Sequence, residues 1–190
     1  FLYALVVGTQ FIETGAYKKV VVVGSDKMSS ITDMSDRNTC ILFGDGAGAF
    51  VLQASDQPGG VLCSVMHSDG SGGDLLTLAG GGSHYPATES TIHDGKHYIQ
   101  MDGKEVFRFA TRVMASATQE VLACAGLTLD QVQWIVPHQA NIRIIEAAAR
   151  GLKLPKDRFI VNLERYGNTS TASITIAMGK ALGKGRIKSG

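Results

Sequence analysis

Two polar side chains, those of His138 and Asn168, stand where a hydrogen-bonding site could form. His138 lies in "WIVPHQANIRII", between an apolar run typical of a buried strand and an amphipathic run typical of a helix. Asn168 lies in "RYGNTSTASI", also between a predicted strand and a predicted helix. Ligands gather at the carboxyl ends of the strands in parallel α/β sheets. The two side chains could therefore face one site, and two such donors would suit the stabilisation of a developing oxyanion.

Each residue also has a purely structural interpretation. Pro137 stops the strand and Asn141 is a good N-cap, so His138 could be a satisfied polar residue at a strand end. Asn168 could likewise cap the helix that follows it. For either residue taken alone the structural interpretation is favoured, and only the pair favours a site.

Two other patterns are weaker signs of a ligand site. The glycines of "FGDGAGAF" lack the full G-x-G-x-x-G spacing, and a predicted strand follows them where a phosphate-binding loop needs a helix N-terminus. They favour close strand packing instead. His93 and His97 stand four apart in "HDGKH", but Gly95 and the lack of a third ligand argue against a metal site. We expect no metal and no bound cofactor.

The elements that must position these side chains are a mixture of helices and strands. Helices are predicted over 1–17, 103–127, 141–151 and 167–185, and strands over 18–26, 40–55 in two segments, 134–137 and 157–163. The β-branched run in 18–26 indicates a strand covered on both faces, as in parallel sheets. The order of elements predicts an α/β fold with a mostly parallel sheet. The turn at 57–60 is the best internal boundary.

Composition narrows the functional classes. The chain has 190 residues, 44% of them hydrophobic, and a formal net charge of +1. That size supports a real core, in one domain or two small halves, and the charge gives no reason to expect binding to nucleic acid or to a membrane surface. No window is apolar for long enough to span a membrane, and "FLYALVV" lacks the features of a signal peptide. The odd, dispersed cysteines (Cys40, Cys63 and Cys124) suit a reducing, cytoplasmic compartment better than a disulfide scaffold.

Four motifs carry a family resemblance: "SDRNT", "FGDGAGA", "VPHQANIRII" and "RYGNTSTASI". In this order and spacing they resemble the β-ketoacyl-[acyl-carrier-protein] synthase III family of the thiolase-like superfamily, over essentially the whole chain. "PHQAN" together with "GNTS" is the specific pair. The resemblance implies a layered αβαβα fold of two similar halves with mostly parallel mixed sheets. Residues 1–58 would end the N-terminal half and residues 59–190 would form most of the C-terminal half.

The resemblance also implies an activity, the starting condensation of fatty-acid synthesis. An acyl group passes from acyl-CoA to a cysteine thiolate, a covalent step. Malonyl-[acyl-carrier-protein] (malonyl-ACP) then loses carbon dioxide, and its carbanion attacks the acyl-enzyme to give 3-ketoacyl-ACP. By motif, His138 and Asn168 are the family's catalytic histidine and asparagine, and we expect both to donate to the thioester oxygen. The implied partners are acyl-CoA, the acyl carrier protein and a second copy of the chain in a homodimer.

The resemblance assigns binding residues as well. Arg37 resembles the arginine that holds the adenine and phosphate end of CoA. Four residues resemble the wall of the pantetheine tunnel: Gly103, Phe107, Ala140 and Asn141. Three arginines resemble a basic patch for an acidic carrier protein: Arg108, Arg143 and Arg150. Each arginine taken alone could be an ordinary surface charge.

No cysteine here matches the family's nucleophile, which lies in an "A-C-[SA]-G-F" segment at a helix N-terminus. Cys40 is predicted in a strand, and Cys124 lies near the C-terminal end of a helix, where the dipole disfavours a thiolate. "FLYAL" resembles the sequence just after that segment, so we expect the chain to be part of a longer enzyme. Two alternatives stay open: a condensing enzyme of a polyketide or secondary-metabolite pathway that uses CoA esters, and a non-catalytic relative.

Overall fold

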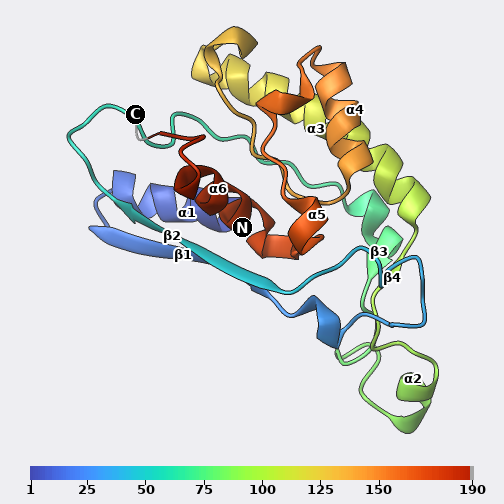
Figure 1. Ribbon diagram of the computed structural model, residues 1–190. Coiled ribbons are helices and arrows are strands. Elements are labelled where there is room, and N and C mark those ends of the chain that lie inside the picture. The colour runs from blue at the N-terminus through green and yellow to red at the C-terminus, as the bar shows by residue number, and fades with distance from the viewer. Residues whose placement is uncertain (189–190) are drawn as a thin grey trace.

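A two-stranded antiparallel sheet forms one side of the molecule in the computed structural model, which describes residues 1–188 (Figure 1). β1 (Lys19–Asp26) pairs with β2 (Gly46–Gln53) along their whole lengths. α1 (Leu2–Glu13) and α6 (Ser173–Gly183) lie on the same face of this sheet (Figure 1). The predicted helices at both ends of the chain are therefore confirmed, with shorter bounds.

The predicted parallel environment of β1 is wrong within the described residues. β1 runs antiparallel to β2, and the side chains of Val21 and Val23 are 62% and 58% exposed while Val22 between them is 4% exposed. A continuous run of valines favours both parallel and antiparallel strands, so the pattern does not predict the direction of the neighbouring strand. α1 and α6 cover one face of the sheet (Figure 1).

Glycines on the covered face let the chain after Asn168 approach the sheet closely. A Cβ on Gly24 would lie 2.8 Å from the carbonyl carbon of Thr171, and one on Gly46 would lie 3.0 Å from Cβ of Thr169. The close-packing interpretation of "FGDGAGAF" is thus confirmed, although the element packed on the glycines is the turn that leads into α6. The sheet thereby fixes the position of that turn.

The second half of the chain packs around two extended segments that lie side by side. Ile135 and Phe159 form an isolated parallel bridge, where strands were predicted over 134–137 and 157–163. On one side, Phe159 packs with buried residues of α4 (Ile142–Gly151), which lies against α3 (Gly103–Ala125). On the other side, Ile160 packs with Ala177 and Ala181 of α6. The segments therefore occupy the middle of the core, as buried strands would.

The remaining elements are short. α2 (Glu89–His93) lies in the long irregular region before α3, and α5 (Leu163–Tyr166) precedes Asn168. β3 (Leu76–Thr77) pairs antiparallel with β4 (Gln100–Met101), just before α3. Gly126, with φ +66°, closes α3 as predicted. No helix within residues 1–188 is long and apolar enough to cross a membrane.

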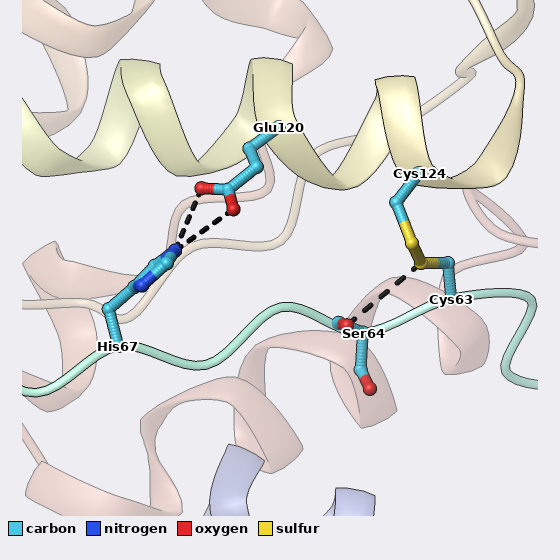
Figure 2. The surroundings of a disulfide bond; sticks show 5 residues. All are labelled: Cys63, Ser64, His67, Glu120 and Cys124. Carbon is cyan, nitrogen blue, oxygen red and sulfur yellow. Dashed lines mark hydrogen bonds and ion pairs between the residues drawn. A yellow bond between two sulfur atoms is a disulfide. The ribbon is translucent and has the colours of Figure 1, made fainter.

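A disulfide bond joins Cys63 to Cys124, whose Cα atoms are 6.2 Å apart (Figure 2). The expectation that the cysteines form no disulfide is therefore wrong for this pair, and within residues 1–188 only Cys40 has a free thiol. Cys40 also lies in a turn and not in the predicted strand. The pair is 61 residues apart in sequence, and the segment after β2 meets α3 only through the tertiary fold. Sequence alone cannot give such a connectivity.

Candidate active site

His138 and Asn168 line the same cavity, which has a volume of about 1000 Å³. The structure brings six of the predicted site residues to its wall: Gly103, Phe107, His138, Ala140, Asn141 and Asn168. The wall is completed by β3, β4 and the chain at 38–43. A cavity of this volume is at the upper end of the range for small-molecule and cofactor sites.

The His138 ring is held by a serine that the sequence analysis missed. Nδ1 of His138 lies 2.6 Å from Oγ of Ser173, a residue in the first turn of α6 that is 3% exposed. Oγ also accepts the N–H of Gln139 at 3.4 Å. Oγ has no other hydrogen-bond acceptor within residues 1–188, so Nδ1 is the acceptor available to the hydroxyl hydrogen. A neutral ring then carries its own hydrogen on Nε2, which is left as a donor.

Ser173 did carry a signal in the sequence. It shares the buried stripe of α6 with Ala177 and Ala181, at intervals of four residues, and is the polar member of that stripe. A hydroxyl on an apolar helix face needs a partner when it is buried. Its partner is His138.

Desolvation by neighbouring protein atoms affects the charge of His138, although the residue remains exposed toward the cavity. Desolvation by the surrounding protein lowers the pKa of His138 below its usual 6.5, because burial disfavours the imidazolium. The ring stays open to the cavity on its accessible side. His138 is therefore a neutral hydrogen-bonding group at neutral pH, and not a cation.

Gln139 replaces a hydrogen bond that Pro137 cannot make. The backbone of Ile135 donates to Arg158 O and accepts from Ile160 N, both at 2.9 Å, as in a parallel ladder. The next step of the ladder would need the N–H of residue 137, and proline has none.

The side chain of Gln139 makes the hydrogen bonds that the next step of this ladder would otherwise make. Its Nε2 donates to Ile160 O at 3.0 Å, and its Oε1 accepts from Asn162 N at 3.0 Å. Nε2 also donates to Pro137 O at 2.9 Å. Gln139 is fully buried, so the carboxamide holds the two segments together immediately beside His138.

The main chain of Asn168 is fixed against the segment just before β2. Asn168 N donates to Leu42 O at 2.8 Å, and Gly44 N donates to Asn168 O at 2.9 Å. Asn168 Oδ1 accepts from Ser170 N at 2.9 Å within the turn, but the N-cap residues of the two helical segments that follow are Thr169 and Ala172, so the prediction that Asn168 caps a helix is wrong. None of residues 1–188 accepts a hydrogen bond from Asn168 Nδ2, which leaves this amide group as a donor at the cavity wall. Oδ1 therefore holds the turn, while Nδ2 of the same side chain is free to donate into the cavity.

Asn141 is the N-cap of α4, as its position predicted. Its Oδ1 accepts from Arg143 N at 2.9 Å at the start of α4. The same residue lines the cavity. The end of the strand-like segment and the start of α4 thus both contribute to the wall.

The four predicted arginines do not line this cavity. Arg37 is exposed in a turn beside Asn38, which does line it. Arg108 pairs with Glu105 at 2.8 Å and borders a separate pocket of about 530 Å³. Arg143 and Arg150 are exposed on α4. Their roles in binding CoA and a carrier protein remain predictions.

Neither a metal cluster nor a thiol occurs at the cavity. Within residues 1–188 no three His, Cys, Asp or Glu side chains are grouped to hold a metal ion. None of the three cysteines of this part of the chain lines the cavity. The chemistry that these residues offer is hydrogen-bond donation from His138 and Asn168.

Comparison with known proteins places the chain in a family. Residues 1–70 match the family model for 3-oxoacyl-[acyl-carrier-protein (ACP)] synthase III, and residues 122–190 match the model for the C-terminal part of that family. The chain is 50% identical over all 190 residues to a β-ketoacyl-[acyl-carrier-protein] synthase III of Caldanaerobacter subterraneus, and covers 57% of that protein. The chain thus spans a little over half the length of this curated relative.

Solved structures of similar proteins have the same fold as this chain. The synthase III of Thermus thermophilus is 43% identical with a TM-score of 0.88, over 98% of this chain and 57% of that chain. The priming β-ketosynthase of the R1128 polyketide pathway is 34% identical with a TM-score of 0.85, over 100% of this chain and 56% of that chain.

The fold of the chain matches these solved structures and is thiolase-like. Within that class, the chain belongs to the β-ketoacyl-[acyl-carrier-protein] synthase III family.

The lowered pKa of His138 predicts a pH-dependent contribution to stability. The unfolded chain binds this proton more readily than the folded protein, so the contribution is complete above the unfolded pKa, about 6.5, and is lost as the pH falls through the folded pKa. Urea unfolding from pH 5 to 8 should show wild-type stability rising with pH relative to His138→Gln. A constant difference between the two proteins across this range would contradict the prediction.

The role of Gln139 predicts a coupling with Pro137. Gln139→Ala should lower the free energy of unfolding by about 3 kcal/mol, because Asn162 N and Ile160 O lose their partner while buried. Pro137→Ala restores a main-chain N–H, so the double variant should lose at least about 0.5 kcal/mol less than the sum of the single losses. Denaturant titration of all four proteins measures the coupling. Strict additivity would show that Gln139 does not replace this step of the ladder.

Proposed function

We propose that the protein acts as a β-ketoacyl-ACP synthase III, an acyltransferase that condenses an acyl-CoA starter with malonyl-ACP. The reaction releases carbon dioxide and gives 3-ketoacyl-ACP, which starts fatty-acid synthesis. The observation that carries the proposal is the presence of two side-chain donors, His138 Nε2 and Asn168 Nδ2, at the wall of one cavity. The relatives named above support it.

The two donors act in the decarboxylation of malonyl-ACP. Loss of carbon dioxide places negative charge on the thioester oxygen, and each donor contributes about 3 kcal/mol to stabilising that charge. The low pKa of His138 keeps the ring neutral with its hydrogen on Nε2. Ser173 is a positioning residue, because it selects this tautomer without touching the substrate.

The first half-reaction needs a thiolate that residues 1–188 do not bring to the cavity. We infer that a cysteine of the longer enzyme accepts the acyl group from acyl-CoA, as the family motif implies. The CoA sulfur leaves as that thioester forms. The carbanion from malonyl-ACP then attacks the acyl carbon, and the enzyme thiolate is the leaving group.

Substrate binding follows from the cavity wall. The pantetheine arm, common to CoA and the carrier protein, would run along Gly103, Phe107, Ala140 and Asn141. Arg37 would hold the adenine and phosphate end of CoA. The exposed arginines on α3 and α4 (Arg108, Arg143 and Arg150) would contact an acidic carrier protein.

The wider architecture is part of the proposal. Residues 1–58 would belong to the N-terminal half of a layered αβαβα fold and residues 59–190 to the C-terminal half, of which residues 189–190 lie outside the described part. The enzyme would be a cytoplasmic homodimer. The exposed valines of β1 would then be covered in the assembled fold.

A second candidate is a condensing enzyme of a polyketide pathway. The likeness to the priming β-ketosynthase of the R1128 pathway favours it. Both candidates use the same donors, so they differ in substrate and not in the chemistry at the cavity. Preference for malonyl-ACP over malonyl-CoA separates them.

Removal of either donor should stop the second half-reaction selectively. In the full-length enzyme, His138→Ala or Asn168→Ala should slow malonyl-ACP decarboxylation by roughly 100-fold or more, while acylation by acyl-CoA persists. Carbon dioxide release and intact-mass spectrometry measure the two steps. His93→Ala is the matched control, since His93 is exposed on α2 outside the cavity. Decarboxylation at the wild-type rate in either donor variant would overturn the assignment.

Charge reversal on α4 should separate carrier-protein binding from CoA binding. Arg143→Glu should raise KM for malonyl-ACP about tenfold more than KM for acyl-CoA, and added salt should reduce the difference. Lys18→Glu changes the net charge equally at an exposed position before β1, and serves as the control. Equal losses with both substrates would instead assign Arg143 to a shared tunnel.

A further inference from the structure

The bond between Cys63 and Cys124 joins a segment without regular secondary structure to a long helix. Cys124 lies in the last turn of α3, a helix of 23 residues. Cys63 lies in the stretch 54–69, which contains no helix or strand and runs alongside α3 (Figure 2). Because the helix is held by its own hydrogen bonds and by α4, a cross-link between the two acts mainly on the irregular stretch.

The other attachments of this stretch are weaker. His67 Nε2 lies 2.8 Å from a carboxylate oxygen of Glu120, one turn before Cys124 (Figure 2). The two side chains are 68% and 49% exposed, and an exposed ion pair contributes little. Tyr3 of α1 adds a hydrogen bond to His67 O at 2.6 Å. The disulfide is thus the strongest link between the stretch and α3.

The anchored stretch leads directly to the wall of the candidate cavity. Asp69 caps the short 3₁₀ helix over 70–75, and β3 follows at once and pairs with β4. Leu75 O accepts from Asp102 N at 2.8 Å, beside the start of α3. Three residues of this part line the cavity: Asp74, Leu76 and Thr77. Only six residues separate Cys63 from the start of that 3₁₀ helix.

We propose that Cys63 and Cys124 are a site of reversible thiol–disulfide exchange with low-molecular-weight disulfides, and that closing the bond restrains the 70–77 wall of the cavity. Cys124 is exposed and Cys63 is half-buried, so a small reagent can reach the pair. Exposed disulfides are the reducible ones, and disulfides of cytosolic proteins are commonly transient. The proposal does not depend on the reaction proposed above.

The exchange balances with glutathione as the reagent. The Cys63 thiolate, which lies outside the helix, attacks a sulfur of glutathione disulfide, which breaks its S–S bond and releases one glutathione thiolate. Cys124, held beside it, then loses its proton and attacks the Cys63 sulfur of the mixed disulfide, which releases the second glutathione thiolate. The two cysteines lose two electrons and two protons, and one glutathione disulfide becomes two glutathione thiols.

The test titrates the full-length protein through a series of glutathione to glutathione disulfide ratios. After quenching with iodoacetamide, peptide mass spectrometry should show Cys63 and Cys124 losing alkylation together and regaining it when the ratio is reversed, while Cys40 stays alkylated. Hydrogen exchange of residues 70–77 should be about tenfold slower in the closed state, with α6 unchanged. Cys63→Ser and Cys124→Ser should abolish this response, and Cys40→Ser should retain it.

Two results would contradict the proposal. If both thiols stay alkylated at every ratio, or if glutathione cannot open the bond in the folded protein, the pair is not a reversible site. If the bond opens and closes but hydrogen exchange of residues 70–77 does not change, the link to the cavity wall is wrong. Neither result bears on the roles of His138 and Asn168.

Discussion

A missing hydrogen-bond donor, that of Pro137, sets the geometry on which the rest of the site depends. A regular strand would have continued past residue 137, and His138 would have been one more side chain along a buried ladder. Proline ends the ladder, but an abrupt end would leave Ile160 O and Asn162 N buried without partners. The Gln139 carboxamide satisfies both atoms, so the segments keep strand spacing while the main chain turns toward α4. His138 is thereby held between two fixed residues.

α6 connects the two candidate donors. The main chain of Asn168 is fixed to the segment just before β2, and five residues later Ser173 holds the His138 ring. The turn between them lies on Gly24 and Gly46, where any larger residue would collide with it. One short, tightly packed turn therefore sets the position of His138 relative to Asn168. Neither donor depends on a flexible loop, which suits a site that must be preorganised.

The sequence predicts local features of this protein well and non-local ones poorly. The helices and the caps at Asn141 and Gly126 follow from patterns within a few residues. The convergence of His138 and Asn168 followed from the rule for strand ends, although the strands themselves are reduced to single bridges. The direction of β1 and the Cys63–Cys124 bond depend on contacts between distant segments. The role of Gln139 could not be predicted from its own residue type, because that role depends on the backbone N–H that Pro137 lacks.

The neutrality of the donors matters under the proposed reaction. In malonyl-ACP the negative charge begins on the carboxylate and moves to the thioester oxygen as carbon dioxide leaves. A cationic imidazolium would attract the carboxylate as well, and so would stabilise the ground state along with the transition state. Neutral N–H groups act over a shorter range and favour the atom on which charge develops. The local desolvation that lowers the pKa of His138 keeps charge off the ring, and the serine that holds Nδ1 keeps the hydrogen on Nε2, so the two effects favour the same neutral donor.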